Sequence, residues 1–164
     1  MSTYLTLSRT GLADGVWPGL ARPPEVGLDP LGPSTAGQAG NVYTVILASG
    51  LEDGGKRATL ALSMGCTALS MDLDTHLFLV GAGSYWAYQG HADGIRIDGF
   101  PSLEELLETF VDLDGDLSVC STCDQALCHA TSPRDNALTR RPGVRIQGMA
   151  ALMDHLMQGR AVTF

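Results

Sequence analysis

The sequence lacks the features that mark several large classes of proteins. Basic residues are few, because ten Lys and Arg stand against 18 Asp and Glu, for a formal net charge of −8. Proteins that bind nucleic acid rely on basic patches that displace counterions, so we expect no nucleic-acid partner. No apolar run approaches the roughly 20 residues that span a bilayer. No basic segment followed by an apolar core opens the chain. The sequence therefore predicts no membrane association and a cytoplasmic location.

Two ligand-binding motifs are present only in part. Gly81-Ala82-Gly83 follows an apolar run, as in a dinucleotide-binding loop, but Trp86 occupies the position of the next required glycine. The segment 112–116 resembles the start of a calcium loop, but its glycine comes too early and Cys123 stands where the bidentate glutamate belongs. We therefore expect a solvated turn at 112–116 and no bound cofactor.

The chain divides into two regions of different composition. Residues 1–40 hold five of the eight prolines and seven of the 20 glycines, without helical or strand periodicity, so they predict a Pro/Gly-rich N-terminal arm. From residue 41 to residue 164, apolar strand-like runs alternate with amphipathic helical patterns. We expect strands at 41–48, 76–80, 117–119, 144–147 and 161–164, and helices at 52–71, 84–89, 102–114 and 149–157. This alternation predicts a single three-layer α/β domain with a mainly parallel sheet.

One helix start has a specific signature. Ser102 follows Pro101 and precedes Glu105 by three residues, the spacing of a capping box. In this motif the serine hydroxyl accepts from the third helical N–H, and the glutamate reaches back to the serine N–H. The sequence therefore predicts that a helix begins directly after Ser102.

The most informative stretch is residues 117–129, which contains three of the four cysteines. Cys120 ends the predicted strand 117–119, and Cys123 follows at the start of a run that can open a helix. Ligands collect at the carboxyl ends of strands in open α/β sheets. The positive end of a helix dipole favours the thiolate, which is the nucleophilic form of cysteine. The placement predicts a reactive thiol at Cys120.

Three functions fit this cluster from the residues alone. Cys120, Cys123, Cys128 and His129 supply four potential zinc ligands, although zinc sites usually draw ligand pairs from separate segments. Cys120 and Cys123 also have the C-x-x-C spacing of a dithiol redox site. In the third function, a single activated thiol accepts a sulfane sulfur as a persulfide and passes it on. Four unreactive thiols are a further alternative.

The other candidate side chains are predicted to be structural. Cys66 lies within the first long helix, where a buried thiol is the ordinary expectation. His76 stands at the start of a strand and His155 within the last helix, and the sequence shows no partner for either. We expect both histidines to serve in packing or at the surface.

The order of these pieces resembles the DsrE/DsrF-like family of sulfur-relay proteins, which includes the TusD subunits. The matching segments are an opening strand and loop, a second strand with its glycine turn, a helix, a strand that ends in cysteine, and a closing strand. In this sequence they are 45–53, 77–83, 99–107, 117–120 and 159–164. The resemblance covers about three quarters of the chain, from residue 42 to its end, and leaves the N-terminal arm without a counterpart.

The resemblance implies a flavodoxin-like or Rossmann-like fold, assembly into homotrimers or hexamers, and cytoplasmic sulfur transfer between donor and acceptor proteins. It also implies that the persulfide forms on the cysteine that ends the third strand, which by position is Cys120. Cys123 would then be an auxiliary or resolving thiol. Cys123 and Cys128 are extra relative to family members that use a single cysteine, which keeps the zinc and dithiol alternatives open.

Overall fold

The computed structural model describes residues 41–130 and 139–164, and the arm predicted for residues 1–40 lies outside them. The five strands form one sheet in the order β4-β3-β2-β1-β5, and every pairing is parallel. The strands are β1 (Val42–Leu47), β2 (Asp74–Leu79), β3 (Asp116–Cys120), β4 (Arg145–Gln147) and β5 (Gly159–Thr163). The helices are α1 (Lys56–Ser70), the 3-10 helix η1 (Gly81–Ala87), α2 (Leu103–Asp112), α3 (Ser121–Ala130) and α4 (Met149–Gln158).

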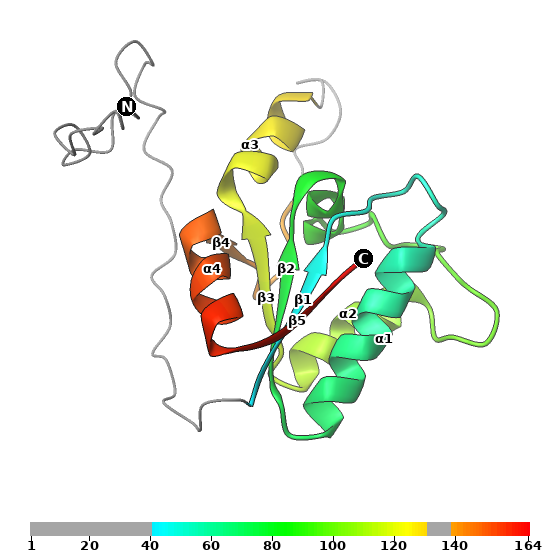
Figure 1. Ribbon diagram of the computed structural model, residues 1–164. Helices are drawn as coiled ribbons and strands as arrows, with labels where there is room; N and C mark the ends of the chain where they lie inside the picture. The colour runs from blue at the N-terminus through cyan, green and yellow to red at the C-terminus, as the bar shows by residue number, and fades with distance from the viewer. Residues whose placement is uncertain (1–40, 131–138) are drawn as a thin grey trace, which may run out of the picture.

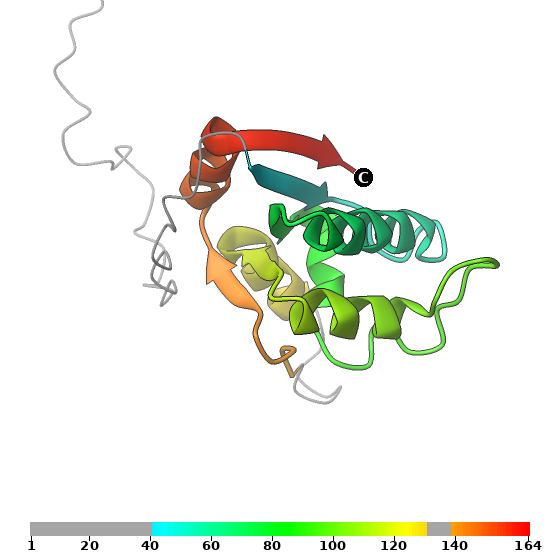
Figure 2. The ribbon, with the colours of Figure 1, turned by 90° about the horizontal axis from the view of Figure 1, so that it is seen from below.

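Helices cover both faces of the sheet (Figure 1). Figure 2 shows α1 and α2 side by side on one face and α4 on the opposite face. α3 continues from the end of β3 and contacts η1. The three-layer α/β fold with a parallel sheet is therefore confirmed. Among the described residues, no helix combines the length and apolar character that crossing a lipid bilayer requires.

Alternation along β3 assigns its side chains to two different environments. Leu117 and Val119 belong to the larger core, which packs against α1 and α2. Asp116, Ser118 and Cys120 project from the opposite face, because successive side chains of a strand alternate. That face is covered by α4, whose Leu152 packs against Cys120. The polar and reactive residues of β3 thus share the α4-covered face.

The first helix begins later than the sequence pattern indicates. Residues 54 and 55 are glycines with φ of +70° and +84°, a left-handed conformation that is incompatible with the α-helix. Asp53 accepts hydrogen bonds from the backbone N–H groups of Gly55 and Arg57, each at 3.0 Å. Helix α1 therefore starts at Lys56 and not near Glu52, because this turn closes on Asp53 first.

The glycine pair after β2 serves backbone packing. Gly81 has a φ of +53°. A Cβ atom on Gly83 would lie 2.0 Å from the carbonyl oxygen of Leu47, so only glycine lets η1 approach the end of β1 this closely. Trp86 of η1 donates an indole N–H to the carbonyl of Ser49 at 2.9 Å. These contacts explain the Gly-x-Gly sequence without a bound nucleotide.

The predicted capping box is present at the start of α2. The backbone N–H of Glu105 donates to the Ser102 hydroxyl at 3.3 Å, and the Ser102 N–H donates to the Glu105 carboxylate at 2.8 Å. The hydrogen bonds from Ser102 hold the pKa of the Glu105 carboxyl below its ordinary value. α2 then buries Leu103, Leu107 and Phe110 against the core.

We expect Ser102→Ala to lower the free energy of unfolding by about 1 kcal/mol, the usual effect of losing a helix N-cap. Urea denaturation followed by circular dichroism measures this change. Thr109→Ala is the matched control, because it removes a hydroxyl of the same helix that lies away from the cap. A loss for Ser102→Ala no larger than the loss for Thr109→Ala would contradict the role of the cap.

Candidate functional site

The third strand delivers Cys120 to the base of a helix, as the sequence predicts. β3 ends at Cys120, and α3 begins at the next residue. Cys120 is 2% exposed and packs with Phe78 of β2 and Leu152 of α4. Cys123 lies one helical turn further, is partly exposed, and packs against the same cluster. Both are free thiols, so the site holds a buried and an accessible sulfur in contact.

The electrostatics of Cys120 differ from the expectation based on the helix dipole. Burial raises the pKa of the Cys120 thiol, and a hydrogen bond with the Cys123 thiol adds to this rise. Hydrogen bonds from the backbone N–H groups of Cys123 and Thr122 act in the opposite direction and favour the thiolate. Desolvation is the largest of these effects, so the pKa of the Cys120 thiol lies above its ordinary value. The resting form at neutral pH is the protonated thiol.

A buried carboxylate anchors the first turn of α3. Asp124 accepts from the Tyr88 hydroxyl at 2.5 Å and from the Arg140 guanidinium at 3.1 Å. Its side chain is only 7% exposed, so both partners are needed to offset its desolvation. These contacts connect the turn that carries Cys123 to the segment after η1 and to the segment before β4. The junction of β3 and α3 is therefore held in place.

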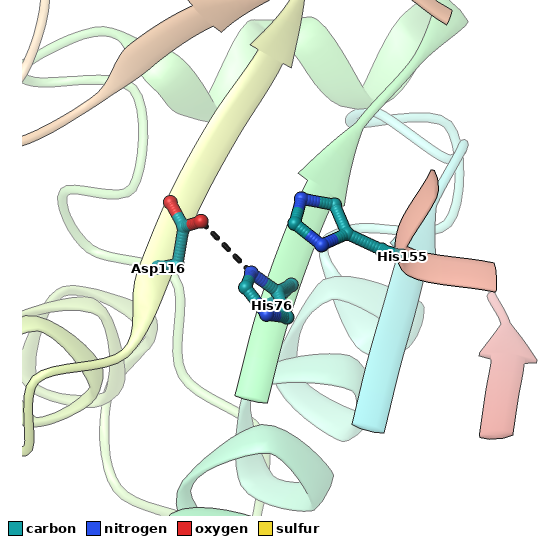
Figure 3. A group of neighbouring side chains, drawn as sticks. All are labelled: His76, Asp116 and His155. Carbon is teal, nitrogen blue, oxygen red and sulfur yellow. Dashed lines mark hydrogen bonds and ion pairs between the residues drawn. The ribbon is translucent and has the colours of Figure 1, made fainter. Parts of the chain in front are cut away.

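The α4-covered face of the sheet also carries a polar network, which lies toward the start of β3, away from Cys120. The carboxylate of Asp116 accepts a 2.9 Å hydrogen bond from Arg145 Nε and pairs with the same guanidinium through a second nitrogen. Nδ1 of His76 lies 2.8 Å from the other Asp116 oxygen. His155 of α4 stacks on His76 with ring centroids 3.8 Å apart (Figure 3). The network thus joins β2, β3 and β4 to α4.

Burial sets the charge of both histidines. It lowers the pKa of His155, and the neighbouring His76 and Arg145 lower it further. Burial also lowers the pKa of His76, with Asp74 acting against this shift and Arg145 adding to it. Nε2 of His155 is buried without a hydrogen-bond partner in the described part of the chain. The stacked pair is therefore neutral at physiological pH.

His76, Asp116 and His155 are also the donor types that bind divalent cations, and their ligand atoms lie within 4.8 Å of one another. Arg145, however, already occupies both oxygens of Asp116 with a positive charge. The two imidazole rings also meet face to face, so they do not converge edge-on toward one point. The arrangement fits an ion-pair network better than a metal centre.

The other predicted site residues have different outcomes. Within residues 41–130 and 139–164, no group of potential metal ligands includes Cys120 or Cys123. The side chains of Cys128 and His129 lie outside the described part, so the four-ligand zinc site stays a prediction. Cys66 is half-buried in α1 and its Sγ lies 3.6 Å from the carbonyl of Leu106. Burial raises the pKa of the Cys66 thiol, as expected of a packing residue.

Comparison with known proteins agrees with this arrangement. The model of the DsrE/DsrF-like family matches residues 42–164, which is about three quarters of the chain. The chain belongs to the DsrE/DsrF-like family. A solved structure with a similar fold is that of the ychN protein from E. coli, with a TM-score of 0.55 and 21% sequence identity. The alignment covers 74% of this chain and 98% of that one. Among curated proteins, none matches this sequence significantly.

Sequence reasoning missed two sets of residues around the cysteines of this DsrE-like domain. The first is the carboxylate anchor, Asp124 with Tyr88 and Arg140. The second is the network of His76, His155, Asp116 and Arg145. Each set joins residues that are far apart in the sequence, from 16 to 40 positions for the hydrogen bonds. For the second set, the available signal was the presence of His76, Asp116 and Arg145 in strands that are otherwise largely apolar.

We expect the DsrE-like domain to lose stability as the pH falls below about 6.5, the ordinary pKa of histidine. The folded chain holds His155 neutral to a lower pH than the unfolded chain does. The stabilisation is complete above the unfolded pKa, and is lost as the pH falls from there through the folded pKa. The contribution of His155 to this loss should not exceed about 1.4 kcal/mol per pH unit, the limit for one proton, and His76, whose pKa is also lowered, adds to it. Urea midpoints measured between about pH 7.5 and about pH 5 test this dependence.

His155→Phe keeps a stacking ring on His76 and removes the titrating group, so its midpoint should vary less with pH. His91→Phe is the control, since His91 stacks on Tyr85 away from this network. A pH dependence as steep in His155→Phe as in the parent protein would show that another group is responsible.

Proposed function

We propose that this protein accepts sulfane sulfur as a persulfide on Cys120 and relays it to a partner protein in the cytoplasm. The observation that carries the proposal is the position of Cys120 at the end of β3, with the backbone N–H groups of Thr122 and Cys123 directed at its sulfur. Helix-terminal N–H groups stabilise negative charge at this position. Membership of a family generally related to sulfur relay supports the same function.

The transfer step needs no redox partner. The Cys120 thiol loses its proton, and its thiolate attacks the outer sulfur of a donor persulfide R–S–SH. The new bond joins Cys120 Sγ to that sulfur, the donor S–S bond breaks, and R–S⁻ leaves and takes up a proton. Because the resting thiol is buried and its pKa is raised, proton loss must coincide with donor binding. The acceptor reverses these steps.

Cys123 has a supporting part in this scheme. It is partly exposed and in hydrogen-bond contact with Cys120. A sulfur received on Cys123 can therefore move inward by attack of Cys120 on the outer sulfur, which leaves Cys123 as a free thiol. The same contact supports one alternative, a dithiol redox protein in which oxidation joins Cys120 to Cys123 in a disulfide.

We expect Cys120→Ser to abolish sulfur loading, because oxygen replaces the acceptor sulfur with little change in volume. The intact mass of the protein after incubation with thiosulfate or a persulfidated donor measures loading as the gain of one sulfur. Cys123→Ser should still load but show altered transfer. Cys66→Ser is the control thiol on α1 and should behave like the parent protein.

Each alternative has its own outcome in this experiment. Full loading of Cys120→Ser would overturn the assignment of the acceptor. A Cys120–Cys123 disulfide after mild oxidation, with no sulfur adduct from any donor, would favour the dithiol protein. Stoichiometric zinc in protein purified without added metal, with thiols shielded until a chelator is added, would favour a zinc-stabilised binding module.

We also propose that the domain assembles into homotrimers or hexamers. Methionines at positions 149, 153 and 157 project from α4 at helical spacing and are 55%, 55% and 81% exposed. Such a row of exposed apolar side chains is typical of a contact surface. Its position opposite the sheet-facing side of α4 leaves it free to meet a second copy.

We expect Met153→Glu to lower the assembly mass measured by light scattering, because it places a charge at the centre of this row. Thr67→Glu is the control, since it adds the same charge to an outward position on α1. An unchanged mass in Met153→Glu would remove α4 from the interface.

A further inference from the structure

A buried glutamine lies beside the proposed acceptor sulfur. Gln147 is the last residue of β4, and its Cα is the register partner of the Cα of Cys120. Register partners on neighbouring parallel strands, about 4.8 Å apart, project their side chains from the same face of the sheet. Gln147 therefore shares the α4-covered face with Cys120, one strand away.

Among the described residues, the side-chain amide of Gln147 has no hydrogen-bond partner. The residue is 2% exposed, and both Nε2 and Oε1 are buried without a hydrogen bond in the described part of the chain. Buried side-chain polar atoms in native proteins nearly always have a partner, so each exception requires an explanation. Ser118, the buried polar residue one step earlier on the same face of β3, donates to Asp116 at 3.2 Å. Gln147 thus lies beside this network without joining it, and both polar atoms of its amide are unpaired among the described residues.

The surroundings of Cys120 need a side-chain donor once sulfur is bound. Cys120 belongs to an apolar cluster with Phe78 and Leu152, and Ile46 and Val80 pack against this cluster. A persulfide is more acidic than the thiol from which it forms, so it carries its negative charge on the outer sulfur. The helix N–H groups reach the inner sulfur, Sγ. Arg145 lies on the same face, but its guanidinium is already paired with Asp116, so it is not free to balance the negative charge of the persulfide.

We propose that the side-chain amide of Gln147 donates a hydrogen bond to the outer sulfur of the Cys120 persulfide, which makes Gln147 a specificity-determining residue for sulfane sulfur. This inference rests on the proposed function. The added S–S bond extends the site by about 2 Å from Sγ. The amide does not hydrogen-bond the resting thiol, so this contact forms only in the loaded state. An interaction made in one state alone shifts the equilibrium toward that state.

Gln147→Met tests the assignment, because methionine keeps the unbranched length and removes the donor. The fraction of chains that gain one sulfur is measured by intact mass at fixed ratios of cysteine persulfide to cysteine. We expect the loading constant to fall on the order of tenfold, as for the loss of a hydrogen bond to a charged group. Removing an unpaired buried amide should leave the urea midpoint equal or higher. Gln158→Leu, a glutamine replaced on the exposed side of α4, should load like the parent protein.

Gln147→Glu is the second variant, since it keeps the shape and opposes the persulfide charge. It should load less than Gln147→Met and raise the pH at which the loaded persulfide ionises, which ultraviolet absorbance follows. Parent-like loading of Gln147→Met would overturn the role of Gln147 while leaving Cys120 as the acceptor. A lower urea midpoint with unchanged loading of the folded fraction would assign Gln147 to structure alone. Failure of the parent protein to load any sulfur would instead remove the proposed function.

Discussion

Burial of both faces of the parallel sheet is the constraint on which the rest of the structure depends. α1 and α2 cover one face and α4 covers the other, so most side chains of the central strands lose their contact with water. Apolar residues gain from this, but charged residues must find partners inside the protein. On the α4-covered face, Asp116 meets this requirement through Arg145 and His76. The same loss of water determines the state of the thiol at the other end of β3.

At Cys120 two physical effects oppose each other. Backbone N–H groups at the start of α3 favour a negative charge on the sulfur, while desolvation beneath α4 disfavours it. Because desolvation is the larger effect, the thiol is stored in its protonated, unreactive form. A donor that brings its own polar groups to the site changes this balance. In the proposed function, loss of the Cys120 proton therefore accompanies docking of the donor.

The sequence was sufficient for the features that depend on neighbouring residues. The capping box at Ser102 and Glu105 and the strand–helix junction at Cys120 are set by local pattern, and both were predicted correctly. The start of α1 was placed too early because the left-handed conformations of Gly54 and Gly55 delay the helix to Lys56. The stack of His76 on His155 could not be predicted, since it depends on the register of β2 and on how α4 crosses the sheet. The burial of Cys120 beneath Leu152 could not be predicted for the same reason, because this contact joins residues far apart in the sequence.

α4 has an inner side that covers the sheet and an outer side that is exposed to solvent. Its inner side places Leu152 and Leu156 against the cluster that contains Cys120, and its outer side carries exposed methionines. Any molecule that binds the outer side acts on the same rigid element that shields the sulfur from solvent. The same helix therefore carries both the side chain that packs on Cys120 and the ring that stacks on His76.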